Sequence, residues 1–159
     1  MNESVPIEKS TKTLLDELVR KTQALTALLI TKQGTVISEA GTTATLNTTA
    51  MAALIAGMFS ATREVARMVG EKQFSILLQQ GETRHIHISL VTESTMMVVV
   101  FENNQRTGRV RYEAKKIGEA LGELLVAADR RDGAASDLSV PKFKEYALNL
   151  IDQIFTAPK

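Results

Sequence analysis

Residues 46–70 read LNTTAMAALIAGMFSATREVARMVG, and this segment decides the fold. It predicts one long helix, because Asn47 is a favourable N-cap residue and Gly70 stands where a left-handed residue ends a helix. At 1.5 Å per residue such a helix is about 34 Å long, comparable with the width of a small domain. A single domain has little chain left to cover both sides of so long a helix.

A helical wheel divides this segment into two halves. One half carries most of the large apolar residues and is the expected core face: Met51, Leu54, Ile55, Met58, Phe59, Val65, Met68 and Val69. The other half is made of small residues in its first turns, with no charged residue between Thr48 and Thr62, and charged residues appear on it only in the later turns. Because small side chains let another backbone approach closely, this half predicts a partner-binding surface: Ala52, Ala53, Ala56, Gly57, Ser60, Arg63, Glu64 and Arg67. The alternative is a helix buried on both sides by its own chain.

Hydrophobic periodicity places further elements on either side of the long helix. The expected helices are 11–22 and 107–129, and the expected strands are 27–31, 35–39, 74–79, 84–91 and 95–101. The last strand contains MMVVVF, which is apolar on both faces and therefore indicates a central strand covered on both sides. The pattern predicts an α+β fold with a five-stranded antiparallel sheet covered by helices.

The strand at 74–79, FSILLQ, has neither charge nor proline, although it is the strand expected at an edge of the sheet. Native edge strands usually carry lysine, proline or a bulge that prevents further pairing. An edge without these features predicts self-association, with two sheets joined edge to edge in a homodimer. The expected dimer interface consists of Phe74, Ser75, Ile76, Leu77 and Leu78.

The C-terminal part is expected to be separate from the domain formed by residues 1–129. Residues 130–139, RRDGAASDLS, are small and polar and predict a linker. Residues 140–159 predict an amphipathic helix that docks on its own domain or on a partner. Its apolar stripe is Phe143, Ala147, Leu150, Ile151, Ile154 and Phe155.

Composition excludes several classes of function. A net charge of +1 favours neither nucleic acid nor a membrane surface as a partner, and the absence of cysteine excludes thiol chemistry. No membrane-spanning run or signal peptide is apparent, so we expect a cytoplasmic protein. His85 and His87 share one face of a strand, but a third ligand is missing, so we expect two imidazoles on a half-solvated face and no metal. We expect no cofactor and no catalytic residues.

Three segments resemble the roadblock domain, the fold of dynein light chains and of several bacterial GTPase regulators. They are LLITKQGTVISEAG, LNTTAMAALIAGMFSAT and MMVVVFENNQRTGRVRYEAKKIGEAL. The resemblance implies a sandwich in which two helices cover one face of the sheet and the long helix covers the other. Together with the C-terminal amphipathic helix, the chain resembles the MglB-type bacterial polarity regulators.

MglB-type proteins are homodimers that bind a small Ras-like GTPase of the MglA type and accelerate its GTP hydrolysis. The resemblance therefore implies a regulator of polarity or motility that holds the GTPase's own catalytic groups in place and contributes no arginine finger. One alternative is a scaffold or adaptor of the same fold that leaves GTP turnover unchanged. Another is a small-molecule sensor, which the lack of clustered titratable residues disfavours.

Overall fold

The computed structural model describes the backbone of residues 6–139 and the side chains of residues 6–132. The chain divides after Glu123 into two units, and the described part of the second unit is the end of one helix. The elements, in order, are α1 (Ile7–Thr22), β1 (Thr26–Thr31), β2 (Val36–Gly41), α2 (Thr48–Met68), β3 (Ile76–Gln80), β4 (His85–Leu90), β5 (Thr95–Phe101), the 3-10 turn η1 (Asn104–Arg106) and α3 (Thr107–Ser139).

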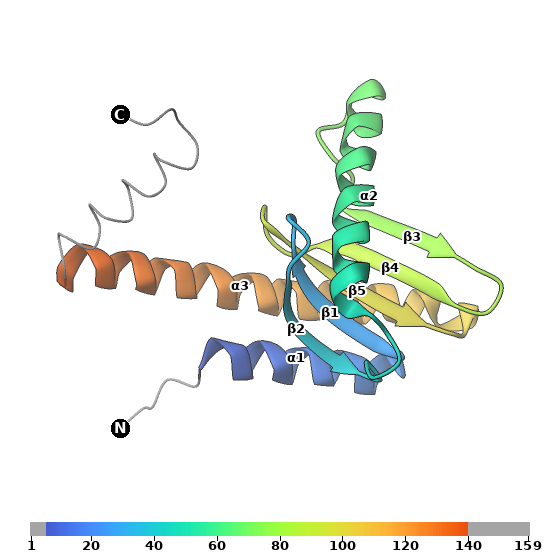
Figure 1. Ribbon diagram of the computed structural model, residues 1–159, viewed down its shortest axis with the longest axis horizontal. Coiled ribbons are helices and arrows are strands. Elements are labelled where there is room, and N and C mark those ends of the chain that lie inside the picture. The colour runs from blue at the N-terminus through green and yellow to red at the C-terminus, as the bar shows by residue number, and fades with distance from the viewer. Residues whose placement is uncertain (1–5, 140–159) are drawn as a thin grey trace. The chain divides into compact units, whose positions relative to one another are not determined.

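The five strands form one antiparallel sheet in the order β2-β1-β5-β4-β3, which confirms the predicted fold class (Figure 1). β5 is the middle strand, and all of its residues are buried, as its apolar sequence predicts. β2 and β3 are the two edges. The β1–β2 hairpin has a register shift between Leu29 and Ile30, close to its turn.

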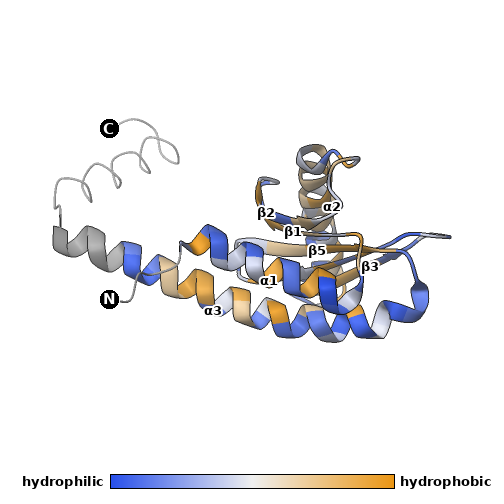
Figure 2. Ribbon diagram, turned by 90° about the horizontal axis from the view of Figure 1, so that it is seen from below, coloured by the Kyte–Doolittle hydropathy of each residue, from blue (hydrophilic) through white to orange (hydrophobic). Residues whose placement is uncertain are grey.

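Helices cover both faces of the sheet (Figure 2). α2 lies on one face, over a cluster that includes Leu28, Ile30, Ile88 and Val98 from the strands. α1 and the first part of α3 lie on the opposite face. They bury residues at helical spacing: Leu15 and Leu18 from α1, and Val110, Ala114, Ile117 and Leu121 from α3.

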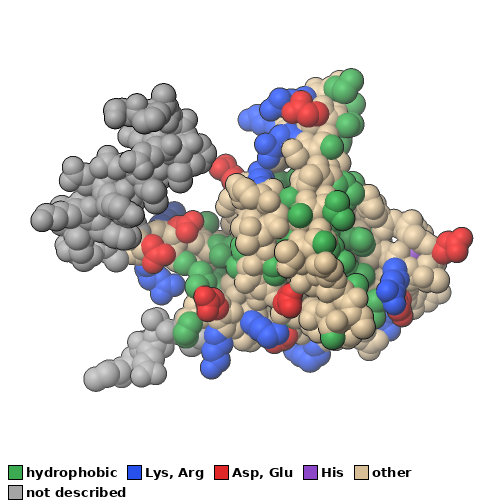
Figure 3. Space-filling model, in the orientation of Figure 1, with side chains coloured by type: hydrophobic (Ala, Val, Ile, Leu, Met, Phe, Trp, Pro, Cys, Tyr) green, Lys and Arg blue, Asp and Glu red, His purple; other side chains and the backbone are tan. Residues whose placement is uncertain are grey.

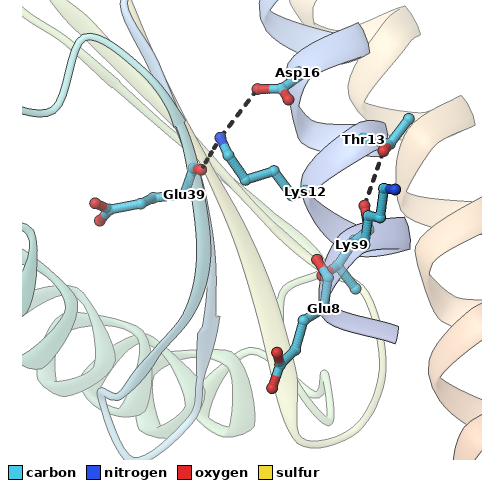
Figure 4. A network of polar contacts seen from close by, with 7 residues as sticks. Glu8, Lys9, Lys12, Thr13, Asp16 and Glu39 are labelled. Atoms are coloured by element: carbon cyan, nitrogen blue, oxygen red, sulfur yellow. Dashed lines mark hydrogen bonds and ion pairs between the residues drawn. The ribbon is translucent and has the colours of Figure 1, made fainter. Parts of the chain in front are cut away.

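Polar contacts tie α1 to its neighbours. Lys21 of α1 pairs with the buried carboxylate of Glu113 on α3, with 3.9 Å between Nζ and Oε2. The Lys12 side chain reaches across to the edge strand β2 and donates a hydrogen bond to the carbonyl oxygen of Glu39, at 3.0 Å (Figure 4). Asp16 pairs with the same ammonium group at 3.3 Å. A lysine therefore occupies a backbone acceptor on β2.

The ends of α2 follow the local signals in the sequence. The Asn47 side chain accepts a hydrogen bond from the Ala50 amide at 3.0 Å, so this residue caps the helix as predicted. Gly70, with φ of +87°, adopts the left-handed conformation that ends helices.

The faces of α2 differ from the prediction. The side chains buried against the sheet are Ala52, Ile55, Ala56, Phe59 and Ala66. Leu54, Val65, Met68 and Val69, which the wheel places in the core, are more than half exposed. Ile55 and Phe59 are buried as the wheel predicts, but the alanines beside them let α2 pack closely on the strands, and the other four large residues lie on the outer side.

α3 is longer than predicted. Residues 130–139, which the composition predicts to be a linker, continue the helix as far as Ser139. The segment has alanines and no proline, and its single glycine costs only about 1 kcal/mol relative to alanine in a helix. The predicted C-terminal helix at 140–159 lies outside the described residues.

Candidate partner interface

The outer face of α2 carries an apolar ridge. Its residues recur at spacings that alternate between four and three: Leu54, Met58, Ala61, Val65 and Met68. Leu54, Val65 and Met68 are 75%, 53% and 85% exposed. This spacing is typical of one helix that packs along another, as in a coiled coil. These five residues form one half of the outer face of α2, and we call them the apolar half of α2.

The rest of the outer face is small or polar. Ala53, Gly57, Ser60, Glu64 and Arg67 are exposed there, and we call them the small half of α2. A Cβ built on Gly57 would meet no atom within 4 Å, so the backbone is open to approach at this position. Arg67 pairs with Glu64 at 3.2 Å, which leaves the charges of this half balanced within one turn.

Contacts with the sheet orient the two halves. The Gln79 side chain of β3 donates a hydrogen bond to the Met58 sulfur at 3.0 Å, so the apolar half is on the side of β3. A Cβ built on Gly34, in the β1–β2 turn, would lie 2.8 Å from the Cα of Ala53. The small half is therefore on the side of the hairpin. In Figure 3 hydrophobic side chains follow the β3 side of α2, and charged side chains gather on its other side.

β3 is an open edge. Ser75 accepts a hydrogen bond from the Leu90 amide, and Ile76 pairs with Ser89 in the next position. Antiparallel pairs alternate, so the backbone groups of Ile76 and Leu78 point away from β4, toward the free side. Both side chains are about 40% exposed, at 40% and 41%. The open edge and the apolar half of α2 thus lie on the same side of the molecule.

The sequence profile of the Roadblock/LC7 domain matches residues 10–101. The chain belongs to the Roadblock/LC7 family. Among solved structures, the roadblock fold of this chain is similar to Myxococcus xanthus MglB, with 27% identity and a TM-score of 0.74 over 80% of this chain and 96% of that chain. The gliding protein MglB of Thermus thermophilus gives 28% identity and a TM-score of 0.70, over 77% and 93% of the two chains. A Roadblock/LC7 domain from Streptomyces avermitilis, at 20% identity and a TM-score of 0.65 over 72% and 97%, is similar in fold. A search of curated sequences returned no match.

Two residues of the predicted partner surface are buried and cannot contact a partner. Ala52 and Ala56 are 0% and 7% exposed in this roadblock domain, because they form the contact between α2 and the sheet. Arg63 is half-buried beside Lys32 of the hairpin, and burial together with Arg63 lowers the pKa of Lys32. The remaining five predicted residues are those of the small half, and they are accessible to a partner.

The predicted dimer residues also divide into exposed and buried ones. Ser75, Ile76 and Leu78 are exposed at the start of the open edge. Leu77 instead packs against the core beneath α2, and Phe74 is half-buried. The apolar half of α2 was not predicted as a surface, although the alternating spacing of Leu54, Ala61, Val65 and Met68 was available in the sequence. The predicted C-terminal docking residues lie outside the described residues.

The two histidines differ from expectation. His85 and His87 are 2% and 3% exposed, so neither lies on a half-solvated face. The sheet face that they occupy is covered by α3, which the strand pattern alone does not reveal. Within residues 6–132 no group of three or more His, Cys, Asp or Glu side chains is placed to hold a metal ion. In the same part of the chain no helix combines the length and the apolar character needed to cross a membrane.

Proposed function

We propose that this roadblock protein is a homodimeric regulator that binds a small Ras-like GTPase of the MglA type and stimulates its GTP hydrolysis. The observation that carries the proposal is the division of the outer face of α2, with its apolar half beside the open β3 edge. The similarity to two MglB proteins, over more than nine tenths of each of their chains, supports the same proposal. One of the similar structures is described as MglB with a tetrameric arrangement.

In the proposed dimer, β3 pairs with β3 of a second copy, and the two sheets become continuous. The apolar halves of the two α2 helices then meet across the two-fold axis and are removed from water. Burying Leu54, Val65 and Met68 in both copies supplies the hydrophobic gain that an exposed edge strand alone lacks. The lysine at the β2 edge disfavours pairing there, so association is directed to β3.

The small half of each α2 remains exposed in this dimer, on the side of the hairpin. Together the two small halves form the proposed platform for the GTPase. Gly57 and Ala53 allow a partner's backbone to come close, and Ser60 offers a hydroxyl at the same surface. A platform of this kind accelerates hydrolysis by holding the switch segments of the GTPase in their competent arrangement.

The arginines of this surface do not fit the role of a catalytic finger. Arg67 is paired with Glu64, and Arg63 is half-buried against the hairpin. Insertion of either side chain into a nucleotide site would break these contacts. We therefore assign the catalytic groups to the GTPase itself. We keep the predicted C-terminal helix as a proposed second contact with the partner.

Single-turnover hydrolysis by an MglA-type GTPase, with and without this protein, tests the proposal. A rate that rises and saturates with the concentration of the roadblock protein is expected. Saturable binding to the GTP-bound form without any change in rate would favour a scaffold instead. Absence of binding to both nucleotide states would contradict a GTPase partner altogether.

A further inference from the structure

A cavity opens between β4 and the first turns of α3, on the sheet face opposite α2. Its volume is about 440 Å³, within the usual range for sites of small molecules. β4 contributes His87 and Ser89, and α3 contributes Arg111, Lys115 and Glu119. The α3 residues are four apart, so they line up along one side of the helix.

His87 is the unusual residue in this cavity. Its side chain is 3% exposed, yet neither ring nitrogen has a hydrogen-bond partner among the described residues. A neutral imidazole carries one N–H donor and one acceptor nitrogen, and buried polar groups are normally paired. His85, two residues earlier, packs against the Phe101 ring with 5.2 Å between centroids and leaves only Nδ1 buried without a partner.

The cations in the cavity are also available. Neither Arg111 nor Lys115 takes part in an ion pair within residues 6–132. Arg109, on another side of the helix, pairs with Glu113 at 3.4 Å. Glu119 is the one carboxylate in the lining, a turn beyond Lys115 and two turns beyond Arg111. Positive charge is therefore concentrated at the Arg111 end.

The opposite wall is apolar. Ile76 lines it from β3 and Val91 from the segment after β4, and Ala114 contributes a methyl group from the helix. Gly118 also lines the cavity, and a Cβ built on it would lie 3.6 Å from the end of the Met97 side chain. The cavity thus combines an apolar wall with two cations and an imidazole that have no partner among the described residues.

We propose that this cavity binds a small organic anion, with its carboxylate or phosphate group between Arg111, Lys115 and His87 and its apolar part against Ile76 and Val91. A guanidinium group binds such oxyanions through two parallel hydrogen bonds. The imidazole N–H of His87 supplies a third donor from the strand side. The site belongs to a single copy of the domain and does not depend on the proposed GTPase partner.

Phenyl phosphate is a suitable probe, with benzyl alcohol as its uncharged counterpart. The chain has two histidines, so NMR signals of the imidazole ring protons report on each one separately. At constant pH we expect the His87 signals to move and saturate with phenyl phosphate, with a Kd of about 1 mM or tighter. The His85 signals serve as an internal reference. Benzyl alcohol is expected to give no saturable shift.

Variants of α3 complete the test. Arg111→Ala changes an exposed side chain and is expected to weaken phenyl phosphate binding at least tenfold. Lys116→Ala removes a neighbouring cation outside the cavity lining and should leave the Kd unchanged. Both variants leave Ser75 and Ile76 intact, which line the cavity and also begin the proposed dimer edge. Unmoved His87 signals, equal affinity in Arg111→Ala, or equal binding of benzyl alcohol would each overturn the proposal.

Discussion

His87 gives the folded domain a specific dependence on pH. Burial, and then the nearby guanidinium of Arg111, lower the pKa of His87 from its ordinary value of 6.5. Below this pH the His87 side chain takes up a proton in the unfolded protein. In the folded protein the same side chain stays neutral until the pH reaches the lowered pKa. The contribution of the neutral His87 side chain to the free energy of unfolding is therefore complete above pH 6.5. As the pH falls below 6.5, this contribution decreases by at most about 1.4 kcal/mol per pH unit.

Urea unfolding at pH 7.0 and at about pH 5.5 measures this loss. We expect the free energy of unfolding to fall less between the two pH values in His87→Gln than in the wild-type protein, because glutamine does not titrate. The comparison uses each protein's own value at pH 7 as its reference, so a constant effect of the substitution cancels. Equal losses in the two proteins would show that His87 is not the group responsible.

At the scale of single residues, the sequence predicted correctly where α2 begins and ends, but it did not predict which side chains of α2 face the sheet. Asn47 and Gly70 act through neighbours a few positions away, so their roles follow from the sequence. Ala56 and Leu54 were assigned to the wrong faces of α2, because a wheel that places large apolar residues in the core assumes a single apolar surface. This helix has two, and the one against the sheet combines Ile55 and Phe59 with alanines that allow close packing.

At the scale of elements, the two halves of α2 can be tested separately, and Gly57 addresses the small half. Gly57→Arg should leave the domain folded, because its Cβ would meet no atom within 4 Å and glycine is disfavoured in helices by about 1 kcal/mol. If the small half binds the GTPase, the arginine must be buried against a close backbone, and affinity should fall at least tenfold. Thermal unfolding, mass in solution and affinity for the GTP-bound partner are measured on the same sample.

Gly108→Arg is the matched control for this experiment. A Cβ at Gly108 likewise meets nothing within 4 Å, and the residue lies in the first turn of α3, away from α2. It should bind the GTPase as the wild type does. A dimeric Gly57→Arg protein that stimulates hydrolysis at the wild-type rate would rule out the small half as the platform.

The edge strand β3 can be blocked through its backbone. The amide of Leu78 points to the free side, so Leu78→Pro removes an outward donor and keeps the bonds between β3 and β4. We expect monomers in sedimentation experiments, whereas Leu78→Ala, which retains the amide, should still dimerise. Leu77 is unsuitable for this purpose because its side chain packs in the core. A dimeric Leu78→Pro protein would contradict edge-to-edge pairing.

The order and type of the elements were predictable because each has its own periodicity. All five strands and the three described helices occur where the sequence placed them, with ends that differ by a few residues at most except in α3. Nothing in residues 130–139 stops that helix, and polar composition alone does not distinguish a linker from a solvated helix. The cavity beside His87 could not be predicted, because it depends on how α3 crosses the strands.

At the scale of the whole molecule, the two edges of the sheet have opposite properties. On β2, the Lys12 ammonium group donates a hydrogen bond to the carbonyl oxygen of Glu39. β3 instead carries exposed apolar side chains and lies beside the apolar half of α2. One edge therefore has a backbone acceptor occupied by a lysine, and the other combines backbone donors with an apolar surface. The open-edge prediction from the sequence identified the correct strand, but only the structure associates that strand with α2.

Dimerisation and GTPase binding use different halves of α2 in this proposal, so one substitution should separate them. Val65 is 53% exposed in the apolar half and lies near the C-terminal end of the helix, where a cation is favourable for helix stability. Val65→Lys should therefore stay folded while two like charges face each other across the dimer axis and shift the protein toward monomers. Each monomer keeps an intact small half, so weak GTPase binding should remain, but stimulation of hydrolysis should be lost because the platform requires two α2 helices. A monomeric Val65→Lys protein that stimulates hydrolysis like the wild type would mean that a single α2 is sufficient, and the paired platform would have to be abandoned.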